Sequence, residues 1–462
     1  MGLFGSIYTG CSGVYATSIG MKVIADNISN LNTTGFKGSR YEFMNELLSC
    51  TQEVLEKEKG LGCFIKNIRT LYTQGGITTT DISTDLAISG KGFFIVQDKD
   101  GNIFYTRDGQ FFINEVDEDH LALQNSMGMY LLGADPTATS ANLDNLQPYL
   151  IPKVMDAKAT SNIKAELILD SRKSVNDQTL IDKYDAQSNP EEPIGNGKYD
   201  WVFNWSIYDN KGDSIPLKLY VDRGNTSNSY EMLLALADPS LDGRGNGKFK
   251  GAFLYGNLTF GASGDIVSAD FSEVGVDGTL TPIDLTQTGK PVFNLNINGN
   301  NQSITLDLGF TVNSDGSIKR ESGVIKMLAN PFTQLSFNQD GYPQGIFDKI
   351  EVITEEGLIR AWYTNQKTID VSRIFLADFS GYEDSLDKMG GNLFKTKSEA
   401  IPFIFAPGSG TRGRLLSGAL ETSNVDLATE MVNLITLQRT FQSNIRVINT
   451  AYQMLEDFLS KV

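Results

Sequence analysis

The chain has 462 residues, of which 40% are hydrophobic and 21% charged, and its formal net charge is −17. This length predicts roughly two to four domains. No apolar run approaches the roughly 18 residues that cross a membrane, which argues against a membrane span. An acidic chain without a compensating basic stretch repels phosphate backbones, so we expect no nucleic-acid partner.

The first residues and the cysteines bear on two further classes. Residues 1–6 lack a basic segment followed by a continuous apolar one, so we expect no cleaved signal peptide. They fit the loose myristoylation pattern, but that modification depends on a eukaryotic enzyme. Cys11, Cys50 and Cys63 are odd in number and lie outside any CxxC spacing. We therefore expect no disulfide framework, and the roles of Cys50 and Cys63 stay open.

The first predicted element is an amphipathic helix within residues 1–30. One apolar column recurs every seven residues, and smaller residues fall between its members on the same predicted stripe. The column consists of Ile7, Val14, Met21 and Ile28, and the residues between them are Phe4, Cys11, Ser18 and Ala25. Asn30 and Gly35 predict its end, because both tolerate left-handed backbone. We expect residues 31–70 to form an extended connector.

The middle of the chain changes from a period of seven to a period of two. Residues 201–208 and 215–221 alternate between apolar and polar on either side of a turn-rich segment, which predicts a β-hairpin. A second hairpin is predicted from Phe293, Leu295 and Ile297 to a strand running from Ile304 to Phe310. The central region is therefore expected to be mainly antiparallel β.

The last ~36 residues predict one long helix, roughly 54 Å at the helical rise. Ser423, with Asp426 three residues later, is typical of a helix start. Two adjacent apolar columns follow. The first consists of Leu427, Leu434, Phe441, Ile448 and Leu455, and the second of Met431, Ile445, Tyr452 and Leu459.

Both terminal helices carry unusually little charge. Between Gly5 and Ser29 the charged side chains are Lys22 and Asp26, whereas a helix with one face in water normally carries more. Periodicity leaves two interpretations open: a coiled coil within one molecule, or helices surrounded by neighbours in a polymer. Under the second, the isolated helices should be frayed in the monomer and fold on assembly.

The sequence predicts no reactive site. His120, the single histidine, lies in the acidic run from Asp117 to Asp119, and we expect it in a solvated turn. Asp98 starts a stretch that resembles a calcium loop, but Gly109 stands where the bidentate glutamate belongs, so we expect a hairpin turn instead. We expect no enzyme, no catalytic residues, no cofactor and no metal.

Three stretches carry a family resemblance: residues 27–37, residues 85–94 continued by 105–109, and residues 418–427 leading into the final helix. Together they resemble the flagellar rod and hook family of axial proteins. The motif residues at the two ends are Asn27, Asn30, Gly35, Phe36, Lys37, Leu420, Glu421, Ser423, Asn424, Val425 and Asp426.

The resemblance implies a mixed, nested fold. Long terminal α-helices would form a coiled-coil-like inner domain from residues 1–30 and 415–462, followed by the connector over 31–70. A discontinuous first β domain would take residues 71–150 and 331–414. Residues 151–330 would form an outer inserted β domain, and both outer domains would be mainly antiparallel. The insertion favours a hook subunit over the shorter rod subunits.

The resemblance also implies a structural subunit that polymerises into a hollow, curved tube, a universal joint that transmits motor torque from rod to filament. Its implied partners are copies of itself, the distal rod protein, the hook cap protein, the hook-filament junction protein and the flagellar type III export apparatus. It would lie in the hook outside the cell, exported without a cleaved signal. Alternatives are a distal-rod-like subunit with an enlarged insertion, or a surface-anchored β-domain adhesin or enzyme.

Overall fold

A computed structural model describes residues 3–47, 60–321, 323–397, 400–409 and 412–460 of the chain. Contacts divide the chain into two compact units. Unit 1 comprises Met1–Lys153, Phe347–Tyr363 and Lys367–Val462, and unit 2 comprises Val154–Ile346 and Thr364–Gln366. The chain therefore leaves unit 1, builds unit 2 and returns to unit 1. Cys50 lies outside the described residues.

Two of the described helices are long, and the others have three or four residues. The helices are α1 (Leu3–Ser29), α2 (Leu180–Lys183), α3 (Leu285–Thr288), α4 (Tyr382–Ser385) and α5 (Leu427–Ser460), with 3-10 turns η1 (Leu143–Asn145) and η2 (Pro239–Leu241). The predicted terminal helices thus correspond to α1 and α5. None of the described helices is long and apolar enough to cross a membrane.

The start of α5 is capped by Asp426 rather than by Ser423. The Asp426 carboxylate accepts the backbone N–H of Thr429 at 3.0 Å, and the Thr429 hydroxyl donates to it as well. The hydrogen bonds from Thr429 lower the pKa of Asp426. Ser423 Oγ instead accepts the N–H of Val425 at 3.3 Å, in the turn that precedes the helix. The predicted start of the helix lies close to the observed one, but the capping residue is Asp426 and not Ser423.

Unit 1 is mainly antiparallel β apart from its two helices. Its strands are β1 (Ser39–Leu47), β2 (Gly60–Thr70), β3 (Ile77–Thr79), β4 (Leu86–Ser89), β5 (Phe94–Gln97), β6 (Ile103–Thr106), β7 (Phe112–Glu115), β8 (His120–Gln124), β9 (Tyr130–Ala134), β10 (Gln147–Pro148), β11 (Ile151–Pro152), β26 (Gly345–Ile353, which begins in unit 2), β27 (Leu358–Tyr363), β28 (Thr368–Ile374), β29 (Leu376–Asp378), β30 (Leu386–Gly390), β31 (Leu393–Thr396), β32 (Phe403–Phe405), β33 (Arg414–Ser417) and β34 (Ala419–Glu421).

The main sheet of unit 1 joins the two halves of the sequence. Its strands follow one another in the order β26, β27, β28, β9, β5, β6, β31, β30. Outgoing strands β3 and β4 also pair with returning strands β34 and β33. An aromatic cluster that includes Phe93, Tyr105, Phe379 and Phe394 fills its core.

Residues 31–70, expected to be an extended connector, contain a two-stranded antiparallel ribbon. β1 pairs with β2 from Ser39 opposite Thr70 to Leu47 opposite Gly60, with two irregularities in the register. Pairing satisfies backbone groups that a single extended strand would leave to water.

Unit 2 is mainly antiparallel β as well. Its strands are β12 (Val154–Met155), β13 (Asn162–Asp170), β14 (Trp201–Tyr208), β15 (Ser214–Arg223), β16 (Ser229–Leu236), β17 (Ala252–Phe260), β18 (Ile266–Val274), β19 (Leu280–Pro282), β20 (Val292–Ile297), β21 (Asn300–Asp307), β22 (Phe310–Val312), β23 (Ile318–Arg320), β24 (Lys326–Leu328) and β25 (Thr333–Gln339).

Two sheets in unit 2 share one core. The strands β14 to β19 form one sheet in sequence order, and β20, β21, β13, β24 and β25 form the other. Phe203 and Leu217 from the first sheet pack in one cluster with Ile163 and Phe293 from the second. Burying such alternating apolar side chains is the main stabilisation of a β-sandwich.

Both predicted hairpins are present. β14 pairs with β15 from Trp201 opposite Val221 to Tyr208 opposite Ser214, and β20 pairs with β21. Phe310 was misplaced: β21 ends at Asp307, and Gly309 turns the chain with φ +80° before Phe310 begins β22. β25 was expected in the first β domain, but it pairs along β13 and so belongs to unit 2.

Asp340 fastens the start of β13 and gives unit 2 a pH-dependent contribution. Its carboxylate accepts the N–H groups of Ser161 and Asn162 at 2.7 and 2.8 Å, the Ser161 hydroxyl, and the Lys158 ammonium. Burial acts to raise its pKa, but these hydrogen bonds outweigh burial and hold the pKa well below 3.8.

We expect Asp340→Asn to lower the free energy of unfolding of unit 2 by about 1–2 kcal/mol at pH 7, a figure discounted for partial exposure. A carboxyl group whose pKa is lowered by folding stabilises the folded state at pH values above its unfolded pKa. This stabilisation is lost as the pH falls from the unfolded pKa through the folded pKa. The difference in free energy of unfolding between the wild type and Asp340→Asn, measured by urea titration, should therefore become smaller below pH 3.8. Exposed Asp270 serves as the Asp→Asn control. A difference unchanged at pH 2 would contradict the electrostatic explanation.

Candidate assembly surface on the terminal helices

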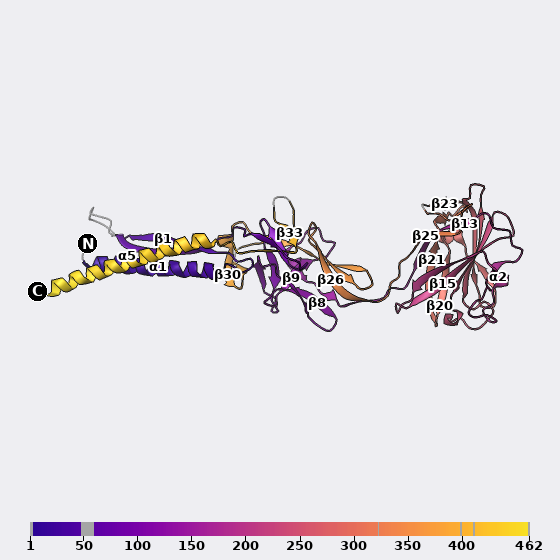
Figure 1. The fold of residues 1–462 in the computed structure, drawn as a ribbon, viewed down its shortest axis with the longest axis horizontal. Helices are drawn as coiled ribbons and strands as arrows, with labels where there is room; N and C mark the ends of the chain where they lie inside the picture. Colours follow the sequence, from indigo (N-terminus) through magenta and orange to yellow (C-terminus); the bar gives the residue numbers. More distant parts are fainter. Residues whose placement is uncertain (1–2, 48–59, 322, 398–399, 410–411, 461–462) are drawn as a thin grey trace. The chain divides into compact units, whose positions relative to one another are not determined.

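Helices α1 and α5 lie side by side and run antiparallel within unit 1 (Figure 1). A Cβ placed on Gly13 would lie 2.5 Å from Asn444 Nδ2, and one on Gly20 would lie 2.9 Å from Leu437 Cδ1. Seven residues further on, Asn27 Nδ2 donates to Glu430 Oε1 at 3.0 Å. Each step of seven along α1 thus matches a step of seven back along α5, which defines a single register.

Glycines allow the close approach of the two helices. Gly10, Gly13 and Gly20 are buried, and a Cβ on Gly10 would lie 2.7 Å from Ile448 Cγ1. Glycine inside a helix costs about 0.5–1 kcal/mol relative to alanine. Here the missing Cβ makes room for side chains of α5, of which Leu437 is the most deeply buried, with 4% of its surface exposed.

The structure places the predicted α1 column beside this contact rather than at its centre. Ile7, Val14, Met21 and Ile28 are all half-buried. The interleaved residues Phe4, Cys11, Ser18 and Ala25, expected on the same stripe, are exposed. A search for apolar side chains passes over glycine, although the spacing of Gly10, Gly13 and Gly20 was visible in the sequence.

On α5 the two predicted columns differ in environment. Leu434, Phe441, Ile448 and Leu455 of the first column are half-buried, while Leu427 is exposed. The second column is exposed throughout. Its members are Met431, Ile445, Tyr452 and Leu459, and Tyr452 keeps 61% of its surface exposed. Sequence reasoning missed the packing roles of Leu437 and Asn444, each of which lies three residues after a member of the first column.

Exposed aromatic side chains also lie on α1. Phe4, Tyr8 and Tyr15 recur at helical spacing and are all more than half exposed. Ribbon β1–β2 covers another part of α1, where the Cys63 N–H donates to Ser12 Oγ at 3.3 Å. Large apolar surfaces on a monomer commonly mark contacts with other proteins. We define the exposed α5 column and these α1 aromatics as the open helix face.

The motif residues gather where the helices join the sheet of unit 1. Lys37 Nζ lies 2.5 Å from Glu421 Oε1, and Arg107 Nη1 lies 3.0 Å from Glu421 Oε2. All three side chains are at most 4% exposed. The Gly75 N–H also donates to Glu421 Oε1 at 2.9 Å. Burial lowers the pKa of Lys37, partly offset by the carboxylate of Glu421. We call Lys37, Arg107 and Glu421 the charge junction.

Two motif asparagines tie the backbone around this junction. Asn27 accepts the N–H of Ser39 and donates to its carbonyl, both at 2.8 Å. Asn424 Oδ1 accepts the N–H of Gly38, and its Nδ2 donates to the carbonyl of Leu71. These amides hold the outgoing and returning strands next to the ends of both helices.

Gly35 is required by its surroundings. Its φ is +67°, and a Cβ there would lie 2.6 Å from the carbonyl carbon of Arg107. Next to it, the Lys388 ammonium lies 4.1 Å from the centroid of the Phe36 ring. The remaining motif residues have local roles: Asn30 donates to the carbonyl of Asp26, Leu420 is buried in β34, and Val425 packs on Gly38.

The residues weighed for chemistry have structural partners. His120 begins β8, is partly exposed, and its Nδ1 lies 2.9 Å from the Asp117 carboxylate. Asp98 caps the hairpin turn between β5 and β6 by accepting the N–H groups of Asp100 and Asn102. Among the described residues, no group of three or more histidine, cysteine or acidic side chains is placed to hold a metal ion.

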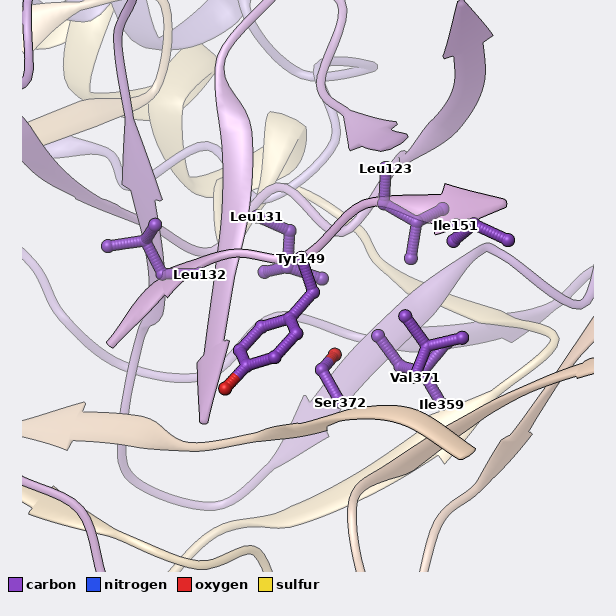
Figure 2. A pocket seen from close by; sticks show the side chains of 8 residues that line it. All are labelled: Leu123, Leu131, Leu132, Tyr149, Ile151, Ile359, Val371 and Ser372. Carbon is purple, nitrogen blue, oxygen red and sulfur yellow. The ribbon is translucent and has the colours of Figure 1, made fainter. Parts of the chain in front are cut away.

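A small hollow opens beside the sheet of unit 1 (Figure 2). Aliphatic side chains from β8, β9, β11, β27 and β28 surround it, together with Tyr149 and Ser372. Its lining residues are Leu123, Leu131, Leu132, Tyr149, Ile151, Ile359, Val371 and Ser372. They include no carboxylate, amine or imidazole, and we assign the hollow to sheet packing.

Four family models match successive parts of the chain. "Flagella basal body rod protein" matches residues 7–37, "Flagellar hook protein FlgE/F/G D1 domain" 87–163, "Flagellar basal body protein FlaE D2 domain" 169–342, and "Flagellar basal body rod FlgEFG protein C-terminal" 416–461. The first and last cover most of α1 and α5. These matches define a flagellar axial protein.

Relatives that match almost the whole length of the chain identify its family within this class. Flagellar hook protein FlgE of Borreliella burgdorferi is 31% identical, with 98% of each chain covered. The FlgE proteins of Treponema pallidum and Salmonella typhimurium are 29% and 28% identical, over 98% and 97% of this chain and 99% and 98% of theirs. The chain therefore belongs to the flagellar hook protein family. It is a structural subunit of the bacterial flagellar hook, not an enzyme.

Proposed function

We propose that copies of this chain polymerise through the open helix face into the hollow, curved tube of the hook. In this proposal α1 and α5 form a coiled-coil-like inner domain. The single observation that carries it is the contrast on α5: the side of Leu437 is filled by α1, while the column of Met431, Ile445 and Tyr452 is exposed. A second copy supplies the apolar surface that this column lacks.

The nested β domains lie outside the helices in this proposal. Residues 1–30 and 415–462 form the inner domain, and residues 71–150 with the returning segment up to 414 form the first β domain. The pairings of β3 with β34 and of β4 with β33 support this discontinuous domain. The outer domain begins near residue 151, and its end belongs near residue 346 rather than 330, because β25 pairs with β13.

The hook then acts as a universal joint that transmits torque from rod to filament. Its further partners are the distal rod protein, the hook cap protein, the hook-filament junction protein and the type III export apparatus, which delivers the chain outside the cell without cleaving a signal. Weak, polar outer contacts allow bending, while the apolar helix contacts hold the tube together.

Removing residues 1–30 and 424–462 tests the proposal. We expect the truncated chain to form no tubes, measured by light scattering and electron microscopy against the full chain. It keeps Lys37, Arg107 and Glu421, so retained β-sheet signal in circular dichroism is the control for folding. Tubes formed by the folded, truncated chain would show that assembly uses other surfaces.

A further inference from the structure

The charge junction brings together three segments that are far apart in the sequence. Lys37 and Glu421 are separated by 384 positions, and Arg107 and Glu421 by 314. Lys37 follows the end of α1, Arg107 follows β6, and Glu421 ends β34, just before α5 begins. Each side chain therefore belongs to a different part of unit 1: the outgoing segment, the sheet, and the returning segment.

Each member of the junction depends on the others for its burial. A charge taken out of water is costly unless it is paired and hydrogen-bonded. Glu421 satisfies two cations at once, and its backbone carbonyl also accepts the N–H of Gly35 at 2.7 Å. Arg107 is held further by the carbonyls of Ile88 and Gly90. Without the carboxylate, two buried cations would lose their shared partner.

We propose that Glu421 is a positioning residue that makes the docking of α5 onto α1 and the closure of the sheet around Arg107 a single cooperative step. This inference rests on the proposed role of the helix pair in assembly. Glu421 lies in β34, which pairs with β3, so its position fixes where the chain enters α5. If the segment that leads into α5 separates from the sheet, Arg107 and Lys37 become exposed to water or lose their carboxylate partner.

A consequence is that the helix pair opens from one end. The Asn27–Glu430 hydrogen bond and the charge junction hold the beginning of α5, whereas after Ala451, the last buried residue of α5, the described side chains are exposed apart from the half-buried Leu455. Fraying in the free subunit therefore starts at the end of α5 distant from Glu421. The segment that follows the junction stays docked as long as the sheet is closed.

Hydrogen exchange of the full-length monomer tests the coupling with Glu421→Gln. We expect amides in the first turns of α5 and amides in β4 and β6 to exchange faster by the same factor, on the order of 100-fold, because breaking a buried ion pair is strongly destabilising. Glu356→Gln is the matched control, since Glu356 pairs with Arg373 in unit 1 but is 57% exposed. Faster exchange in α5 with an unchanged sheet would overturn the proposal.

The double variant Glu421→Gln/Lys37→Met separates charge from shape. It removes one cation along with the carboxylate and restores the net charge of the junction, so we expect it to regain most of the lost protection. Equal or greater loss of protection would overturn the electrostatic coupling, and this comparison remains informative if Glu421→Gln is only marginally folded.

A pH profile gives a second signature. In Glu421→Gln the carboxylate beside Lys37 is gone, and Arg107 is the charged group that still faces the Lys37 side chain. The Lys388 ammonium donates to the backbone carbonyl of Lys37. A lysine whose folded pKa lies below its unfolded value binds more protons in the unfolded state, so stability rises with pH up to about 10.5. We expect the urea midpoint of Glu421→Gln to rise from pH 7 to 10, and the double variant to lack this added rise. Identical profiles would contradict the proposal.

The same variants distinguish this inference from the proposed function. Slower polymer growth of Glu421→Gln, restored in the double variant, supports both. If exchange is coupled but growth stays at the wild-type rate, the helix pair is not the assembly site and the coupling still stands. If exchange in the monomer is uncoupled, the inference fails whatever the polymer does.

Discussion

Replacing Met431 and Tyr452 with lysine is expected to raise the critical concentration for tube formation strongly while leaving the folded monomer nearly unchanged. Both side chains are exposed on α5, at 46% and 61%. Surface substitutions of this kind usually change stability by no more than about 0.5 kcal/mol, and lysine is a good helix former. In the proposed polymer, however, each lysine would enter an apolar contact without a partner.

The expected size of the effect follows from that burial. A cost of about 2 kcal/mol per subunit corresponds to a critical concentration roughly 30-fold higher. The chain carries a formal net charge of −17, so two added positive charges reduce repulsion between copies rather than increase it. Lost assembly could then be attributed only to the contact. Lysine at these positions therefore isolates the contact better than aspartate would.

Sedimentation of polymer against total protein concentration measures this effect, and thermal unfolding of the monomer checks the fold. Ser443→Lys is the control, because Ser443 is exposed on a polar side of the same helix. A normal critical concentration for the Met431→Lys/Tyr452→Lys variant would exclude the exposed α5 column from the assembly contact. A variant that unfolds would show that these exposed side chains contribute to packing within unit 1.

Periodicity predicted the elements better than it predicted their contacts. The alternation of Phe203, Trp205 and Ile207 identified β14 because alternate side chains of a strand share a face. The heptads of α5 identified the helix for the same kind of reason. On α1, however, the contact includes glycines, whose lack of a side chain hides them from any apolar pattern. The column that the pattern selected lies beside the contact.

The charge junction could not be derived from local sequence. Lys37 and Glu421 were recognised as motif residues, but nothing within either segment indicates that the two meet, because their contact depends on the nested topology. Arg107 was noted within a family-like stretch and not as part of a site. Ribbon β1–β2 was missed because strand pairing depends on a partner elsewhere in the chain, and the sequence of residues 48–59 carries no strong hairpin signal.

Leu437→Ala tests the other side of α5, the side that α1 fills in the monomer. Leu437 is 4% exposed and packs where Gly20 lacks a Cβ. Removing a buried leucine side chain costs about 2–5 kcal/mol, and α1 cannot move closer to fill the space without disturbing its other contacts. We expect the monomer to lose protection against hydrogen exchange in α1 between Gly10 and Asn27. Loss of helical circular dichroism on mild heating should accompany it.

Ile435→Ala is the matched control, since Ile435 lies on the same helix with 49% of its surface exposed. It should leave the monomer's exchange unchanged. If Leu437→Ala were equally harmless, α1 and α5 would be independent in the free subunit and would order only on assembly, the second interpretation that periodicity left open. If Leu437 acts in the monomer and Tyr452 only in the polymer, one helix has two functional sides: one holds the subunit together and the other joins it to the next.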